Sequence, residues 1–239
     1  MIATAPTHTA LPAVSANSHG AAIRTEGLTK RFGNLTAVRG VDLQVARGEV
    51  VGFLGPNGAG KTTTIRMLLG FLRPTAGTCS VLGGSLATDV SLRRRVGYLP
   101  GDFRVDPGMT AHDLFAWFGR LRGGLNKGRV EELLNRLQLD PGRRFGTLSK
   151  GNRQKVGLVQ AFMNDPEVLI LDEPSSGLDP LVQREFLVMV SEAAARGCAV
   201  LFSSHVLPEV ERAAHRVAII REGRLVASGP VRELLDRTR

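Results

Sequence analysis

The sequence predicts an α/β fold in which short strands alternate with helices. Apolar, strand-like runs such as VVGFL and EVLILDEP are each followed by a segment whose apolar residues have helical spacing. Glycine is frequent, with 28 residues, as expected for tight junctions between strands and helices. The chain has 239 residues, of which 43% are hydrophobic, so it can form one large domain or two small ones around a sizeable core.

The first predicted elements are strands, beginning near Ala22. The segments AIRTEGLTKRF and AVRGVDLQVARGEVVGFLG are typical of short strands separated by glycine turns. Residues 61–72 have helical spacing and follow the strand VVGFL directly. We expect a strand and a turn at 78–87, a short helix at 89–95 and a further strand in RVGYLP.

The middle of the chain interrupts this alternation with helices alone. MTAHDLFAWFGRLRG and KGRVEELLNRLQL, between about Thr110 and Leu139, have helical spacing, and LSKG precedes a helix that runs to about Met163. We therefore expect a helical insert at about 103–160. Residues 91–156 carry 14 Lys or Arg against 6 Asp or Glu, so most of the net charge of +9 lies here. A solvated helical face and a surface for an anionic partner or a membrane are both open readings.

Alternation resumes in the last third of the chain. EVLILDEP is an unbroken apolar run typical of a buried strand, and the amphipathic helix LVQREFLVMVSEAAARG follows it. AVLFSS predicts a strand and LPEVERAA a short helix. RVAIIREGRLVASG predicts a β-hairpin that turns at Glu222 and Gly223, and VRELLDR a terminal helix.

The composition limits the class of protein. Cys79 and Cys198 lie far apart, so the sequence has neither a disulfide framework nor a metal-binding spacing, which fits a reducing cytosol. No apolar run approaches the roughly 18 residues of a membrane span. Residues 1–20 contain no Lys or Arg and no continuous apolar stretch, so we expect a disordered tail and not a secretory signal. The net charge and the pI of about 10.7 suit a nucleotide, a nucleic acid or an anionic lipid, or reflect an arginine-rich composition alone.

The segment GPNGAGKT, Gly55–Thr62, fits the phosphate-binding pattern G-x-x-x-x-G-K-[ST]. Its glycines let backbone N–H groups wrap phosphates without Cβ clashes. Lys61 would reach the β and γ phosphates, and the hydroxyl of Thr62 would ligate Mg²⁺. A chance glycine-rich turn is the alternative, but the buried strand before the segment and the helix after it both favour the phosphate loop.

Two later strands deliver polar side chains to the same predicted sheet edge. Asp172 and Glu173 end the run VLILDEP, where ligands bind in an open α/β sheet. Asp172 would hold the Mg²⁺ shell, and Glu173 would polarise an attacking water. His205 follows AVLFSS and would hydrogen-bond the γ-phosphate or the water, although a single His at a strand end is often structural. Together with Lys61 these residues predict hydrolysis of a nucleoside triphosphate.

A second anion-ready segment is LSKGNRQKVG, 148–157. Ser149 would cap the helix that starts here, and Arg153 and Lys155 add positive charge to its first turn. Helix N-termini with free N–H groups and nearby cations attract anions. The residues alone therefore predict two phosphate-binding features in one chain.

Five segments occur in the order and spacing of the ABC-type ATPases: GPNGAGKTT, LSKGN, LILDEP, SGLDP and SSHVL. Over residues 22–239 the chain resembles the nucleotide-binding subunit of an ABC transporter. The resemblance implies a P-loop NTPase cassette over 21–239, with a RecA-like core sheet, an antiparallel β subdomain and an inserted helical subdomain. It also implies that two subunits sandwich ATP, and that hydrolysis to ADP and phosphate drives a membrane partner.

The resemblance assigns roles residue by residue. Lys61, Glu173 and His205 would be catalytic, with Glu173 as the base and His205 as the switch histidine, and Thr62 and Asp172 would support Mg²⁺. Asp179 would lie in the loop that links the two sites. The nucleotide would contact Phe32, through adenine stacking, and the phosphate loop and signature loop, which comprise Gly55, Pro56, Asn57, Gly58, Ala59, Gly60, Lys61, Thr62, Thr63, Ser149 and Gly151.

The sequence departs from the family pattern in two places. The signature is LSKGN in place of LSGGQ, with Lys150 and Asn152 as the changed residues. In GYLPGDF, Gly101 replaces the Gln that senses Mg²⁺ and water, and Asp102 beside it could take the place of that Gln. The pair GYLPGDF and LSKGNRQK resembles the exporter branch that includes antibiotic-resistance and ABC-2-type systems.

The resemblance therefore implies an ATPase with ATP and Mg²⁺ as cofactors, which powers export of a drug, antibiotic or lipid-like substrate. Its partners would be a separate transmembrane permease, docked by the insert, and a second copy as a homodimer, at the cytoplasmic inner face of the membrane. We expect no nucleic acid. A soluble relative acting on nucleic acid or ribosomes is the alternative, although Lys61 and Ser149 are too close in sequence for a long coiled coil. A binding-only cassette is a third reading, kept open by Gly101.

Overall fold

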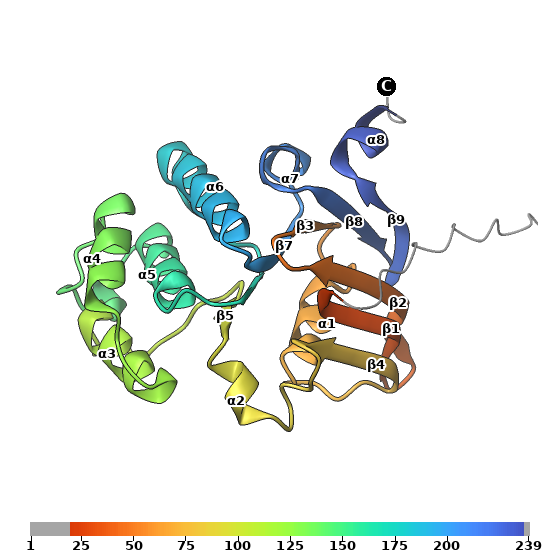
Figure 1. The fold of residues 1–239 in the computed structure, drawn as a ribbon, viewed down its shortest axis with the longest axis horizontal. Helices are drawn as coiled ribbons and strands as arrows, with labels where there is room; N and C mark the ends of the chain where they lie inside the picture. Colours follow the sequence, from red (N-terminus) through yellow and green to blue (C-terminus); the bar gives the residue numbers. More distant parts are fainter. Residues whose placement is uncertain (1–19, 237–239) are drawn as a thin grey trace, which may run out of the picture.

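The computed structural model describes residues 20–236, which form two sheets flanked by helices (Figure 1). The larger sheet has the strand order β5-β6-β7-β3-β8-β9 and is parallel except for β9. Its strands are β3 (Val50–Leu54), β5 (Val96–Leu99), β6 (Val168–Leu171), β7 (Ala199–Ser204), β8 (Arg216–Arg221) and β9 (Arg224–Pro230). The smaller sheet is antiparallel and consists of β2 (Leu35–Ala46), β1 (Ala21–Phe32) and β4 (Ala76–Val81). The predicted α/β class, with a core sheet and an antiparallel β subdomain, is confirmed.

Helices follow the strands in the predicted order. They are α1 (Lys61–Leu68), α2 (Val90–Arg93), α3 (Ala111–Arg122), α4 (Lys127–Arg136), α5 (Lys150–Phe162), α6 (Pro180–Ala195), α7 (Leu207–Ala213) and α8 (Val231–Asp236), with a 3₁₀ turn at Phe145–Thr147. The first helix is shorter than the predicted 61–72, because Gly70 has a φ of 74° and cannot continue it. The hairpin turn at Glu222 and Gly223 is confirmed, with left-handed φ values of 50° and 80°. The predicted tail lies, apart from Gly20, outside the described residues.

The larger sheet separates two hydrophobic cores. Successive residues of β6 alternate between them, since side chains of a strand point to opposite faces. One core joins α1 to the smaller sheet through residues such as Ile65 and Ile23. The other joins α5 and α6 through residues such as Val159 and Phe186. Helices α1 and α5 therefore cover opposite faces of the sheet.

Helix α5 packs very closely on β5. A Cβ atom on Gly97 would lie 2.2 Å from the carbonyl oxygen of Ala161, so only glycine permits this approach. Helices α3 and α4 lie at the side of the molecule away from the smaller sheet (Figure 1). Thr110 and Asp113 form a reciprocal capping box at the start of α3, and Asn126 caps α4.

An arginine joins the insert to the core. Arg136, near the end of α4, lies 2.5 Å from Glu185 and 2.6 Å from Glu192, both on α6, and its side chain is 19% exposed. The two carboxylates hold the pKa of Arg136 above its usual value, with the hydrogen bond that Arg136 donates to Glu192 as the largest cause. This ion-pair cluster is one attachment of α4 to α6.

We predict that Arg136→Met lowers the free energy of unfolding by about 1–3 kcal/mol, because it leaves the carboxylates of Glu185 and Glu192 without this partner. This value lies between the effects of breaking an exposed ion pair and a buried one. Urea unfolding measures the change. Arg120→Met is the matched control, because Arg120 is exposed on α3 and is expected to change the free energy by less than about 0.5 kcal/mol. Equal changes in the two variants would contradict the assigned role of Arg136.

Among residues 20–236, no helix combines the length and the apolar composition that crossing a membrane requires.

Candidate functional site

The loop Gly55–Thr63 lies at the carboxyl end of β3 and runs into the first turn of α1. The N–H of Gly55 donates to the carbonyl of Ser204 at 3.2 Å, which ties the loop to the end of β7. Gly60 has a φ of 109°, and a Cβ there would lie 2.7 Å from Ala37 O. The first turn of a helix leaves its N–H groups without intrahelical partners. The loop can therefore offer backbone donors to phosphate, as the motif predicts.

Lys61 is buried at the base of this loop, with 5% of the residue exposed. Its Nζ donates to the carbonyls of Gly55 at 2.6 Å and Pro56 at 3.2 Å. The same Nζ lies 3.2 Å from Oε1 of Glu173. A fixed positive charge therefore stands between the phosphate loop and the carboxylate at the end of β6.

Thr62 and Asp172 meet at hydrogen-bond distance, although 110 residues separate them. The hydroxyl of Thr62 donates to Oδ2 of Asp172 at 2.7 Å, and Ser203 donates to Oδ1 at 2.6 Å. Asp172 is 2% exposed. A carboxylate and a hydroxyl are hard oxygen ligands of the kind that Mg²⁺ takes together with phosphate oxygens and waters. The two residues predicted to hold the ion thus fit it in type and in place.

Glu173 has an unusual backbone, with a φ of 49°. The left-handed conformation costs an L-residue about 1–2 kcal/mol, so neighbouring contacts must stabilise it. The N–H of Glu173 donates to Oγ of Ser203 at 2.9 Å. Its carboxylate oxygen Oε2 lies 2.7 Å from Nδ1 of His205. Lys61 on one side and His205 on the other therefore fix the direction of this carboxylate.

The other predicted nucleotide contact near this edge is Phe32, at the end of β1. Phe32 is 46% exposed, and Nζ of Lys30 lies 5.2 Å from the ring centroid. The hairpin partner of Phe32 is Leu35, two residues before Ala37, which contacts the phosphate loop at Gly60. An exposed aromatic ring near the loop is suitable for stacking on a base.

Ser149 and Gly151 lie on a different part of the molecule from Lys61. Ser149 caps α5, and its hydroxyl accepts the N–H of Asn152 at 3.2 Å. Helix α5 covers the face of the sheet opposite α1, and the two helices lie apart in Figure 1, so the signature loop opens a helix on the other face from the helix that follows the phosphate loop. The structure explains Lys150, whose Nζ donates to Ser176 Oγ at 3.0 Å, whereas nothing in it explains Asn152.

The departure at Gly101 leaves a space beside the Asp172 carboxylate. A Cβ at this position would lie 3.6 Å from Oδ2 of Asp172, so a longer side chain there would point into the site. Asp102 does not take this place, because its carboxylate pairs with Arg104 at 2.7 Å and is 72% exposed. The hydrogen bond from Arg104 lowers the pKa of Asp102. Asp179, further on, caps α6 by accepting the N–H groups of Leu181 and Val182.

Two side chains that contact the residues of this site, Ser203 and Gln154, were assigned no role from the sequence. Ser203 donates to Asp172 and accepts the N–H of Glu173. The sequence signal that could have identified Ser203 is a serine at the end of a buried strand. Gln154, 4% exposed on α5, donates to the carbonyls of Glu173 and Pro174. The signal for Gln154 was a polar residue on the buried face of an amphipathic helix.

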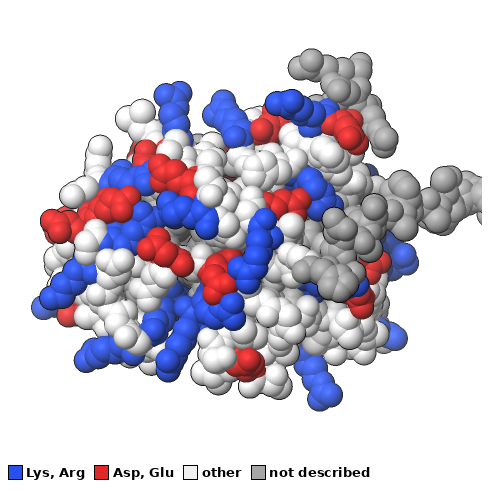
Figure 2. Space-filling model, viewed as in Figure 1, with Lys and Arg blue, Asp and Glu red and all other residues white. Residues whose placement is uncertain are grey.

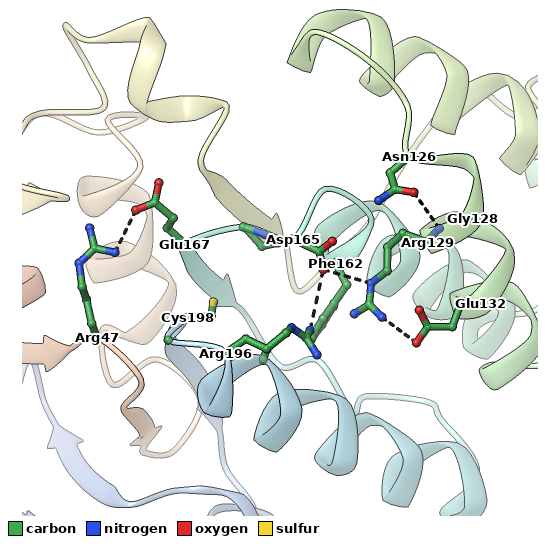
Figure 3. Close-up of a pocket in the computed structure, with 13 residues that line it drawn as sticks. Arg47, Asn126, Gly128, Arg129, Glu132, Phe162, Asp165, Glu167, Arg196 and Cys198 are labelled. Atoms are coloured by element: carbon green, nitrogen blue, oxygen red, sulfur yellow. Dashed lines mark hydrogen bonds and ion pairs between the residues drawn. The ribbon is translucent and has the colours of Figure 1, made fainter.

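A cavity of about 830 Å³ lies elsewhere, between the starts of α4 and β6 and the end of α6 (Figure 3). Its arginines are paired with carboxylates that line the same cavity: Arg47 with Glu167 at 2.9 Å, and Arg129 with Glu132 at 2.7 Å. Burial raises the pKa of the Cys198 thiol in its wall to about 12. Neutralised cations and a protonated thiol do not make a phosphate site or a nucleophile.

Comparison with protein families places the chain among transport ATPases. The model of a family described as "ABC transporter" matches residues 38–176, more than half of the chain. A Nod factor export ATP-binding protein I from Paraburkholderia xenovorans is 40% identical over 87% of this chain and 71% of that protein. A bacitracin transport ATP-binding protein from Enterococcus faecalis is 37% identical over 91% of this chain and 72% of that protein.

A solved structure of the ATP-binding subunit of an ABC transporter has the same fold. It superposes with a TM-score of 0.83 over 90% of this chain and 92% of that chain, at 30% sequence identity.

Proposed function

The chain belongs to the ATP-binding subunits of ABC transporters, and on that premise we propose that it hydrolyses ATP to power a separate membrane permease. The observation that carries the proposal is the convergence at one sheet edge of Lys61, Glu173 and His205, with Thr62 and Asp172 beside them. These side chains come from α1 and from the ends of β6 and β7. Their types are those that phosphoryl transfer to water requires.

We assign the roles as follows. The loop Gly55–Thr63 binds the phosphates through its backbone, and the charge of Lys61 balances the negative charge of the β and γ phosphates. Thr62 and Asp172 hold Mg²⁺, which when bound neutralises charge on the triphosphate. Glu173 accepts a proton from the attacking water at Oε2 or Oε1, and His205 holds that carboxylate in place. Phe32 stacks on the adenine.

The nucleotide site is completed by a second copy of the chain. Ser149 caps α5 and Gly151 lies in its first turn, and α5 lies across the sheet from α1, which follows the Lys61 loop. They open a helix whose first N–H groups and flanking cations suit an anion. We therefore assign them to the ATP of the partner in a homodimer.

We further propose that the transported substrate leaves the cell, and that it is a drug, an antibiotic or a lipid-like molecule. The two named relatives are proteins of Nod factor export and of bacitracin transport. The pair GYLPGDF and LSKGN supports the same exporter branch. The subunit would lie at the cytoplasmic face of the membrane, bound to the permease.

The permease is proposed to dock through the helical insert at about 103–160, beside a groove of about 700 Å³ formed with α2, β5 and the end of α1. Exposed apolar side chains border the groove, including Phe71, Val90 and Leu121. Four arginines and a single aspartate line it: Arg93, Arg94, Arg104, Arg122 and Asp102. Figure 2 shows Lys and Arg side chains gathered on this side of the molecule, around α3.

One guanidinium nitrogen of Arg122 in this groove lacks a hydrogen-bond partner. One guanidinium nitrogen, NH2, donates to Val96 O at 3.2 Å, but NH1 is buried without a hydrogen-bond partner. Burial lowers the pKa of Arg122. Because a buried unpaired charge is costly, a carboxylate from the docking segment would be stabilised here. The occupant we propose is an amphipathic helix of the permease with an acidic residue on its apolar face.

We predict that Leu121→Glu lowers co-purification of the chain with the permease by at least about tenfold, since it places a negative charge where apolar and acidic groups must dock. The measurement is affinity capture of a candidate permease that is co-expressed with the chain, with circular dichroism as the check on folding. Val188→Glu is the matched control, because Val188 is 43% exposed on α6, outside the groove. Unchanged capture by Leu121→Glu would exclude this groove as the docking site.

A further inference from the structure

The first two turns of α5 are attached to the loop that carries Glu173. Gln154 is buried, with 4% of the residue exposed, and its amide Nε2 donates to Pro174 O at 3.0 Å and to Glu173 O at 3.3 Å. Both amide hydrogens are thus used on consecutive carbonyls. The proposed ATP hydrolysis assigns no role to this side chain.

One of these hydrogen bonds holds the backbone of Glu173, which has an unfavourable conformation. Glu173 has a left-handed φ of 49°, so its peptide groups need external partners. Ser203 accepts its N–H at 2.9 Å, and Gln154 donates to its C=O at 3.3 Å. The two side chains come from different elements, β7 and α5, and together they hold Glu173 on both sides.

The same helix also contacts the loop further along. Lys150 donates to Ser176 Oγ at 3.0 Å, and its stem lies 3.2 Å from the place of a Cβ on Gly177. A Cβ on Gly151 would lie 2.6 Å from Gly177 O, so the two backbones touch. The helix that Ser149 opens is therefore in contact with the loop from Glu173 to Gly177 at three successive points.

We propose that Gln154 is a positioning residue for Glu173, through which the helix of the signature loop sets the catalytic carboxylate of its own chain. The inference rests on the proposed function, in which Ser149 binds the nucleotide of the partner. Closure of α5 on the nucleotide held by the partner then moves or steadies Glu173 in the other site. One rigid helix thereby couples the two sites of the dimer.

The test uses Gln154→Met, which keeps the length and the volume of the side chain and removes both donors. We expect kcat for ATP hydrolysis by the full chain to fall about tenfold, with KM changed by less than about threefold, because Gln154 acts on the carboxylate and not on the bound nucleotide. The matched control is Gln183→Met. Gln183 donates to Ser175 O at 3.5 Å, in the same loop, and to Leu178 O at 3.2 Å, but not to Glu173. We expect the kcat of the Gln183 variant to stay within about twofold of the unsubstituted chain.

A second readout separates positioning from folding. In a Glu173→Gln background, Gln154→Met is expected to leave ATP-induced dimers intact in size-exclusion chromatography. Gln154→Asn, one methylene shorter, serves as the second variant if the Met protein does not fold. Unchanged kcat, equal losses in the Gln154 and Gln183 variants, or loss of the dimer would each overturn the proposal. If the unsubstituted chain does not hydrolyse ATP, it is the proposed function that fails.

Discussion

Glu173→Gln is expected to reduce ATP hydrolysis by at least about a hundredfold while leaving ATP bound, since removal of a general base costs about 10²–10⁴ in rate. The amide keeps the shape of the side chain but cannot accept the proton of water. It also removes the negative charge that lies 3.2 Å from Lys61 and 2.7 Å from His205. Because the product state is not reached, the ATP-bound dimer should accumulate.

Phosphate release and size-exclusion chromatography with Mg²⁺ and ATP measure the two effects. Glu209→Gln is the control, because Glu209 accepts hydrogen bonds from Ser175 and Ser204 near the site but not from the residues assigned to catalysis. We expect it to retain hydrolysis within a few-fold. If Glu173→Gln hydrolyses ATP as fast as the unsubstituted chain, Glu173 is not the base.

Ser149→Arg is expected to abolish both ATP-induced dimers and turnover, while ATP binding by the monomer stays within about threefold. Ser149 caps α5 on the face of the sheet opposite α1, so a large side chain there does not touch the phosphate loop of the same chain. In the proposed dimer the arginine would fill the space of the γ-phosphate of the partner. Loss of the cap alone costs only about 1 kcal/mol of stability.

A fluorescent ATP analogue measures binding, and light scattering measures the dimer. Ser191→Arg carries the same charge at an exposed position of α6, where the Ser191 hydroxyl donates to Leu187 O, and it should behave as the unsubstituted chain. Loss of ATP binding by the Ser149→Arg monomer would contradict the assignment of Ser149 to the partner's nucleotide.

The sequence predicts that the residues proposed for catalysis lie close together, because each of them ends or begins a strongly patterned segment. Asp172 and Glu173 follow an apolar run, and Lys61 follows a glycine-rich loop after another. Parallel strands bring their carboxyl ends to one edge, so proximity follows from the fold class. The contact between Thr62 and Asp172, 110 residues apart, is an instance of that rule.

Contacts between elements could not be predicted in this way. The link from Gln154 to Glu173 depends on the rotation and depth of α5 over the sheet, which close packing at Gly97 decides. The pairing of Asp102 with Arg104, which takes Asp102 out of the site, depends on the path of a loop without periodicity. Helical spacing predicted a first helix at 61–72, which is longer than the helix in the structure. A hydrophobic pattern does not reveal the left-handed φ of Gly70.

The attachment of the predicted insert to the rest of the fold is a further example. Helical periodicity alone groups α5 with α3 and α4, within about 103–160. In the fold α5 packs against β5 and shares one hydrophobic core with α3 and α4, and Arg136 attaches α4 to α6. These contacts depend on how the helices pack in three dimensions, which helical periodicity does not give.

The central claim is that each ATP site is composed of Lys61 from one copy and Ser149 from another. Mixing the Lys61→Ala and Ser149→Arg proteins tests it most directly. Neither variant alone should hydrolyse ATP, but a mixed dimer contains one site with both residues intact. We expect an equal mixture to regain activity, up to about half of the unsubstituted rate if all dimers are mixed, since each mixed dimer has one intact site of two. A mixture no more active than the sum of its separate components would contradict the claim.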